Sequence, residues 1–140
     1  MKNEIKFKKR KKWGLVNIIL MIVAPRNEYN KTWCTFNKTV YTPGWISEDI
    51  VAHEMVHVKQ QKNFFYAIWW WFRHTTSRTF RYNQELEAYR TQYRWILQNV
   101  KGMKQAEAAF KVRVSIAGGL GGPLYKWLKP VEEIMRDLEK

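Results

Sequence analysis

Hydrophobic residues form two dense runs in the first third of the chain, and both have the composition of β-strands. Residues 13–25 are almost entirely apolar, rich in Ile and Val, and end in Pro, which favours a buried strand over a membrane segment. The run is also shorter than the roughly 20 residues that cross a bilayer. Residues 32–41 are rich in β-branched and aromatic side chains and predict one strand, or two short strands that turn near Asn37-Lys38.

From residue 47 onwards, apolar positions recur at helical spacing. The first predicted helix has Ser47 at its N-cap and ends near Lys62. A second begins near Tyr82 or Asn83, and its buried stripe is Leu86, Tyr89, Tyr93, Ile96 and Val100. A third covers about 105–114 and precedes a glycine-rich loop at 117–123, which lacks the Gly-Lys-Ser/Thr ending of a phosphate-binding loop. The last helix covers 131–138.

Residues 64–72 form the most apolar stretch of the chain. Nine residues are too few to span a membrane. We expect them to form part of the core or a wall beside the helix at 47–62, with contact to a membrane interface as the alternative. His74, which follows, has no partner at ligand spacing, and we expect it at the surface or at a helix cap.

The length and charge of the chain indicate one basic domain. With 140 residues, of which 46% are hydrophobic and eight are Trp, the chain is long and apolar enough for a core. The net charge of +13 favours anionic partners. Six of the seven residues from 6 to 12 are Lys or Arg, which predicts a flexible basic arm over 1–12 before a single domain at 13–140.

That arm has two interpretations. It is either a solvated tail or a binding segment for nucleic acid or an anionic membrane surface, although no zinc-finger or RNA-recognition signature accompanies it. Cys34 is the only cysteine, so it forms no disulfide within the chain and does not imply export. We expect a monomeric cytoplasmic protein, with membrane association as the alternative.

The strongest chemical signal is His-Glu-x-x-His at His53, Glu54 and His57. Residues four apart lie on one face of a helix, so both imidazoles can bind one Zn²⁺ ion. Glu54 lies about 100° round the helix, where it can act as the general base without being a ligand. The flanking residues are mostly apolar, which predicts a buried helix in which unpaired polar groups would cost several kcal/mol. The alternative is a solvated helix that carries two His by chance.

A catalytic zinc site needs a third protein ligand. The candidates are Glu85 and Glu87 on the next strong helix, and these two point to nearly opposite faces. Ala88 follows Glu85 one turn later, where a small residue allows close packing on the helix of the His pair. The face arithmetic favours Glu85 over Glu87.

Together, the strand before Pro43, the residues His53–Gln61 and the Glu-x-x-Ala at Glu85–Ala88 resemble the gluzincin metallopeptidases, particularly the small single-domain ones. The resemblance covers about residues 35–125. It implies an α+β, zincin-like fold, in which a small N-terminal sheet packs on the His-Glu-x-x-His helix and on a Glu-bearing helix, with further C-terminal helices. It also implies Glu85 as the third ligand. Tyr89 stands where many gluzincins carry Asp.

These features predict a zinc metallopeptidase that hydrolyses a peptide or protein substrate, with Zn²⁺ held by His53, His57 and Glu85 and with Glu54 as general base. An extended substrate is expected to pair with the strand near Val40. Candidate oxyanion donors are Tyr82, Tyr89, Tyr125 and nearby Arg residues. The alternative is a basic, non-catalytic protein that binds nucleic acid or an anionic membrane and has a structural or vestigial metal site. A compact basic peptidase of this kind is compatible with a phage product.

Overall fold

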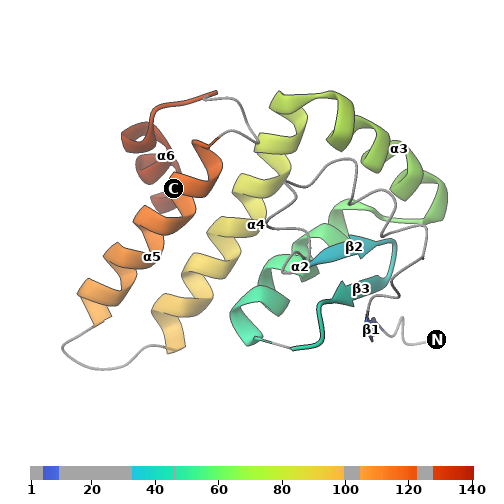
Figure 1. Cartoon of the computed structure of the whole chain (residues 1–140), viewed down its shortest axis with the longest axis horizontal. Helices are drawn as coiled ribbons and strands as arrows, with labels where there is room; N and C mark the ends of the chain where they lie inside the picture. The colour runs from blue at the N-terminus through green and yellow to red at the C-terminus, as the bar shows by residue number, and fades with distance from the viewer. Residues whose placement is uncertain (1–4, 10–32, 46, 100–104, 123–127) are drawn as a thin grey trace.

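The computed structural model describes residues 5–9, 33–45, 47–99, 105–122 and 128–140. These residues form a three-stranded sheet and five helices, which confirms the α+β class (Figure 1). The strand predicted at 13–25 lies outside the described residues. Within the ranges that the structure describes, no helix has both the length and the apolar character needed to cross a membrane.

The predicted β-segment before the first helix is a hairpin. Strands β2 (Cys34–Phe36) and β3 (Thr39–Thr42) pair antiparallel, with Thr35 opposite Val40. The turn between them holds Asn37 at a φ of 52°. Asn adopts this left-handed conformation more readily than most residues. The version of the prediction with two short strands is therefore the correct one.

Strand β1 (Lys6–Lys9) differs from the flexible arm predicted over residues 1–12. It pairs parallel with β3 and makes β3 the central strand, in the order β1-β3-β2. All four β1 side chains stay exposed, so the lysines keep their hydration while the backbone pairs. The run of Lys and Arg residues at 6–12 predicts that these side chains are exposed to solvent. It carries no signal for the backbone pairing, because any non-proline residue can satisfy a sheet edge.

Three helices follow the sheet and surround the polar motif. Helix α2 (Glu48–Gln60) begins after Ser47 as predicted, although the Ser47 hydroxyl donates to the Asp49 carboxylate instead of accepting from the helix backbone. Helix α3 (Phe64–Thr76) is capped by the Asn63 side chain, which accepts from the Tyr66 backbone N–H. Helix α4 (Arg78–Asn99) begins earlier than predicted and packs against both α2 and α3.

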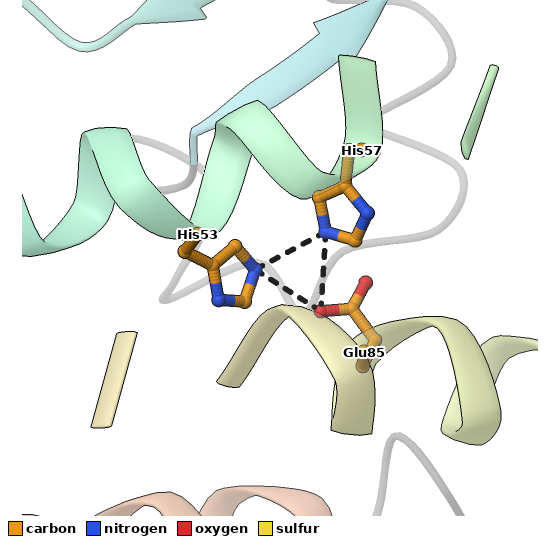
Figure 2. A group of neighbouring side chains, drawn as sticks. All are labelled: His53, His57 and Glu85. Atoms are coloured by element: carbon orange, nitrogen blue, oxygen red, sulfur yellow. Dashed lines mark hydrogen bonds and ion pairs between the residues drawn. The ribbon is translucent and has the colours of Figure 1, made fainter. Parts of the chain in front are cut away.

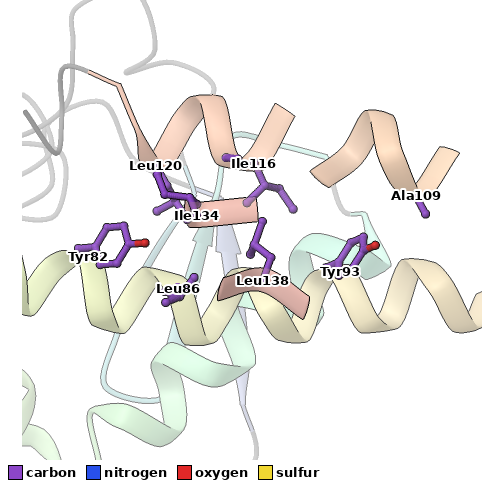
Figure 3. Close-up of a cluster of buried hydrophobic side chains, with 9 residues drawn as sticks. Tyr82, Leu86, Tyr93, Ala109, Ile116, Leu120, Ile134 and Leu138 are labelled. Atoms are coloured by element: carbon purple, nitrogen blue, oxygen red, sulfur yellow. The ribbon is translucent and has the colours of Figure 1, made fainter. Parts of the chain in front are cut away.

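Helices α5 (Gln105–Leu120) and α6 (Val131–Glu139) complete a hydrophobic cluster on another face of α4 (Figure 3). The buried members are Tyr82, Leu86, Tyr93, Ala109, Ile116, Ala117, Leu120, Ile134 and Leu138. Helix α5 runs through Gly118 and Gly119, which the sequence assigns to a loop. Glycine lowers helix stability by only about 1 kcal/mol per residue. Burial of the flanking Ile116 and Leu120 offsets that loss, so the helix continues.

Helix α6 is fixed to its surroundings by Asp137. Its carboxylate accepts from Lys129 Nζ and Lys140 Nζ, both at 2.8 Å, and its backbone carbonyl accepts from Arg90 Nε on α4. The hydrogen bond from Lys129, followed by the one from Lys140, lowers the pKa of Asp137 to about 2. The folded state therefore favours the ionised carboxylate.

Replacing Asp137 by Asn is expected to lower the free energy of unfolding at pH 7 by about 1 kcal/mol. In the wild type, this contribution is complete above the ordinary Asp pKa of 3.8 and is lost as the pH falls towards 2. Urea denaturation between pH 2 and 7 measures both effects. Glu132→Gln, at an exposed position of the same helix, is the control and should leave the pH profile unchanged. Identical profiles for wild type and Asp137→Asn would contradict the assignment.

Candidate metal centre

Three donor atoms from α2 and α4 converge at one point (Figure 2). His53 and His57 project from successive turns of α2, and their Nε2 atoms lie 3.1 Å apart. Glu85 reaches in from α4, with Oε2 at 3.4 Å from His53 Nε2 and 3.6 Å from His57 Nε2. Both imidazoles are buried. Among the described residues, this is the only group of three His, Cys, Asp or Glu side chains that could hold a metal ion.

The spacing of these atoms fits a tetrahedral ion. Zinc bonds of about 2.0–2.2 Å at tetrahedral angles place neighbouring ligand atoms roughly 3.3 Å apart. The three separations, 3.1, 3.4 and 3.6 Å, bracket that value. Two imidazole nitrogens and one carboxylate oxygen are also a donor set that zinc accepts. The residues present therefore fit a zinc-like divalent cation.

Glu85, and not Glu87, faces the two histidines. Glu87 points away from them, and its Oε2 accepts from Gln60 Nε2 at 2.9 Å. Only one of the two can face the histidines, because residues two apart on a helix diverge by about 200°. Ala88 is fully buried, and α2 packs closely beside α4, as expected for a small residue on the face shared with Glu85.

Gln60 orients one of the histidines, a role that sequence reasoning missed. Its Oε1 lies 2.8 Å from His57 Nδ1. An amide oxygen only accepts, so Nδ1 carries a proton and Nε2 is directed at the cluster. The Gln60 amide group in turn donates to the Gln84 carbonyl and to Glu87. The available signal was the three-residue spacing after His57, which puts Gln60 on the same side of the helix.

His74 is the main correction to the predicted site. The sequence places it at the surface or at a cap, but its Nε2 lies 2.9 Å from Glu85 Oε1. Its ring stacks on Trp70, with the centroids 4.5 Å apart. Burial lowers the pKa of His74, although Glu85 acts in the opposite direction, so the neutral ring donates its proton to Glu85. The contact between His74 and Glu85 arises because α3 packs against α4. The spacing of residues along the chain does not predict this packing.

The charges within the cluster are strongly coupled. Burial by itself lowers the pKa of His57, but the negative charge of Glu85 and its hydrogen bond raise it to about 9. Burial raises the pKa of Glu85, whereas the charge of His57 and bonds from three histidines hold it well below 4.5. Without a metal, the site therefore pairs a protonated His57 with an ionised Glu85. A cation would replace that proton.

Replacing His74 by Phe is expected to weaken zinc binding about 10- to 100-fold, because Glu85 loses the donor that orients it. His74→Gln, which keeps a donor, should restore part of the affinity. Competition with a chromogenic zinc chelator measures the effect. Thr76→Ala, at an exposed position of α3, is the control. Equal affinities for His74→Phe and the control would show that His74 does not position Glu85.

Glu54 lies beside the cluster and has a separate partner. It is buried, with 5% of its surface exposed, and its Oε2 accepts from Thr35 Oγ1 at 2.6 Å. Thr35 belongs to β2, so the sheet fixes the carboxylate that follows the first histidine on α2. Thr35 and Glu54 are 19 positions apart in the sequence, and no sequence pattern predicts their contact.

Of the tyrosines expected to stabilise an oxyanion, Tyr89 is the one placed at the site. Its ring meets His53 edge to face, with the centroids 4.4 Å apart, and burial raises its pKa. Tyr82 instead belongs to the hydrophobic cluster of α4, α5 and α6 (Figure 3). Tyr125 lies outside the described residues. Among the described residues, Tyr89 is therefore the predicted oxyanion donor that lies against a histidine of the cluster.

The expected pairing of substrate near Val40 is contradicted. Val40 lies on the central strand, between Phe7 of β1 and Thr35 of β2. On the side of β2 away from β3, the Thr35 carbonyl already accepts hydrogen bonds from Gln61 Nε2 and Trp71 Nε1, both at 2.9 Å. The β1 strand, whose pairing the sequence does not reveal, takes the position that a substrate strand would need.

Comparison of the chain with protein-family models, with curated proteins and with solved structures finds no match in any of the three.

Proposed function

We propose that the protein is a zinc-dependent metallopeptidase with a zincin-like fold, related in its site to the gluzincins. The observation that carries this proposal is the convergence of His53, His57 and Glu85, with the buried Glu54 beside them. The substrate class is a peptide or protein.

Each side chain has a distinct role in this proposal. His53, His57 and Glu85 would hold the ion, and Gln60 and His74 orient two of these ligands. Bound zinc supplies a Lewis acid that polarises the scissile carbonyl and makes a water molecule more acidic. Glu54 takes a proton from the attacking water and delivers it to the leaving amine.

The contact between Thr35 and Glu54 supports the role of the base. Thr35 donates to Oε2, which fixes the carboxylate and leaves Oε1 to accept the transferred proton. A carboxylate this deeply buried is costly unless it is hydrogen-bonded, and the Thr35 hydroxyl meets that need. The pair thus holds a proton acceptor one helix position away from a metal ligand.

The number of ligands favours catalysis over a structural role. Structural zinc sites normally have four protein ligands, whereas catalytic sites have three and leave one position open. The described cluster offers three donors, one from each of its side chains. Among the described residues, this count supports the peptidase over the alternative of a basic binding protein with a purely structural metal.

Hydrolysis of a quenched fluorescent peptide library tests the proposal. Activity should disappear when zinc is removed by a chelator and return when one equivalent of zinc is added, because the ion supplies the Lewis acid. Zinc added to the double variant His53→Ala/His57→Ala is the control and should restore nothing. Activity that survives complete zinc removal would refute the proposed mechanism.

A further inference from the structure

Helix α3 presents a large apolar surface to solvent. Five bulky side chains have exposed fractions of 44–81%: Phe64, Phe65, Ile68, Trp69 and Phe72. Their spacing of one, three and four residues places all five on one side of the helix. Figure 1 shows α3 along the outer margin of the molecule. We call the side of the helix that carries these five exposed side chains the outer face of α3.

The inner face of α3 already has its partners. Ala67 and Trp70 are buried, the Trp70 indole donates to Gln84, and the Trp70 ring lies against His57. A helix that is apolar all round is normally buried all round. An exposed contiguous apolar patch of this kind marks a binding surface. The outer face of α3 is therefore expected to be covered in the functional state.

The charge around α3 restricts what covers it. The 30 residues from 55 to 84 contain no Asp or Glu, and five Lys or Arg: Lys59, Lys62, Arg73, Arg78 and Arg81. Lys62 Nζ lies 5.3 Å from the Tyr66 ring centroid, near the start of α3, and the Arg73 guanidinium lies 5.7 Å from that of Trp69, nearer its end. The occupant must therefore be both apolar and anionic.

We propose that the outer face of α3 binds the surface of an anionic lipid bilayer, with the helix lying in the plane of the interface. Trp and Phe side chains favour the boundary between headgroups and acyl chains, and the flanking cations attract anionic headgroups. The described helices are too short or too polar to span a bilayer, which agrees with a surface attachment. This inference does not depend on the proposed peptidase activity.

Attachment through α3 would place the metal centre next to the membrane. Trp70 and His74, on the inner side of the same helix, contact His57 and Glu85. Only the thickness of one helix, about 10 Å, then separates the bilayer from the cluster. If the proposed activity holds, its substrates are peptide segments close to a membrane surface.

Flotation of the full chain with vesicles tests the inference. The probes are vesicles of phosphatidylcholine alone and vesicles that contain one-third phosphatidylglycerol, at low and high salt. The test variant is Phe65→Ser/Phe72→Ser, at the two most exposed positions of the face. Phe110→Ser is the matched control, because Phe110 is 53% exposed but belongs to α5. Light scattering on the same samples reports the oligomeric state.

The wild type and Phe110→Ser should bind the anionic vesicles equally, and the double variant should bind roughly 100-fold more weakly, about tenfold per lost aromatic contact. High salt should weaken binding only in part, because the apolar contribution remains. Failure of the wild type to bind the anionic vesicles would overturn the inference, and so would equally tight binding to the vesicles of phosphatidylcholine alone. It would also be overturned if the double variant bound like the wild type, which would assign binding to another basic segment. A wild-type dimer that the double variant dissociates would assign the face to a second copy of the chain.

Discussion

Replacing Glu54 by Gln is expected to lower the rate of peptide hydrolysis roughly 10²- to 10⁴-fold while leaving the zinc content unchanged. Gln keeps the size of the side chain and can still accept from Thr35, but it cannot take a proton from water. Glu54 is not one of the three converging donors, so the metal site should stay intact. Steady-state rates on a fluorescent peptide, together with elemental analysis of the same samples, measure both quantities.

Glu48→Gln is the matched control, because Glu48 is exposed at the start of the same helix. Its activity should equal that of the wild type. Full activity in Glu54→Gln would contradict its role as the base. Loss of zinc in that variant would instead assign Glu54 a structural part in the site.

Replacing Glu85 by Gln is expected to weaken zinc binding by well over the roughly 100-fold typical of an orienting residue, and to abolish hydrolysis. The change removes the only anionic donor of the cluster and the charge that balances a cation between His53 and His57. Chelator competition measures the affinity, and circular dichroism reports whether the helices remain.

Glu87→Gln is the matched control, two residues away on the same helix. Glu87 contacts only the outer side of the site, through Gln60, so its loss should weaken zinc binding no more than about tenfold. Equal losses in the two variants would show that Glu85 is not a direct ligand. A larger loss in Glu87→Gln would reverse the assignment of the two glutamates.

Local patterns account for the parts of this protein that the sequence predicts well. The β2–β3 hairpin, the start of α2 at Ser47 and the shared face of His53 and His57 each depend on residues within a few positions of one another. The choice of Glu85 over Glu87 also needs only the helical period and the small Ala88 one turn after Glu85. Such features depend on the conformational preferences of individual residues and on their spacing, so they can be predicted without the tertiary structure.

Contacts between distant segments account for the parts that were missed. His74 meets Glu85 only because α3 folds back against α4, and Thr35 meets Glu54 only because β2 lies beside α2. The pairing of β1 with β3 uses backbone groups that every residue has, so a run of lysines gives no sign of it. The contacts of His74 and Thr35 orient the side chains of Glu85 and Glu54. Both contacts form only when the tertiary structure packs.

Helix α3 shows how one apolar stretch can be divided between the core and the solvent-exposed surface. The sequence offers a wall of the core or a membrane interface for residues 64–72. Trp70 on the inner side forms the wall beside His57, whereas Phe65 and Phe72 on the outer side remain exposed. A composition-based prediction treats the stretch as one unit, but a helix divides it between two environments.

The most direct test of the central claim is the zinc content of the purified chain, measured by elemental mass spectrometry without added metal. The wild type is predicted to carry about one zinc per chain, and the single variants His53→Ala, His57→Ala and Glu85→Ala to carry much less. A folded wild-type protein that is free of zinc and does not take it up when it is supplied would contradict the metal centre. So would variants that retain as much zinc as the wild type.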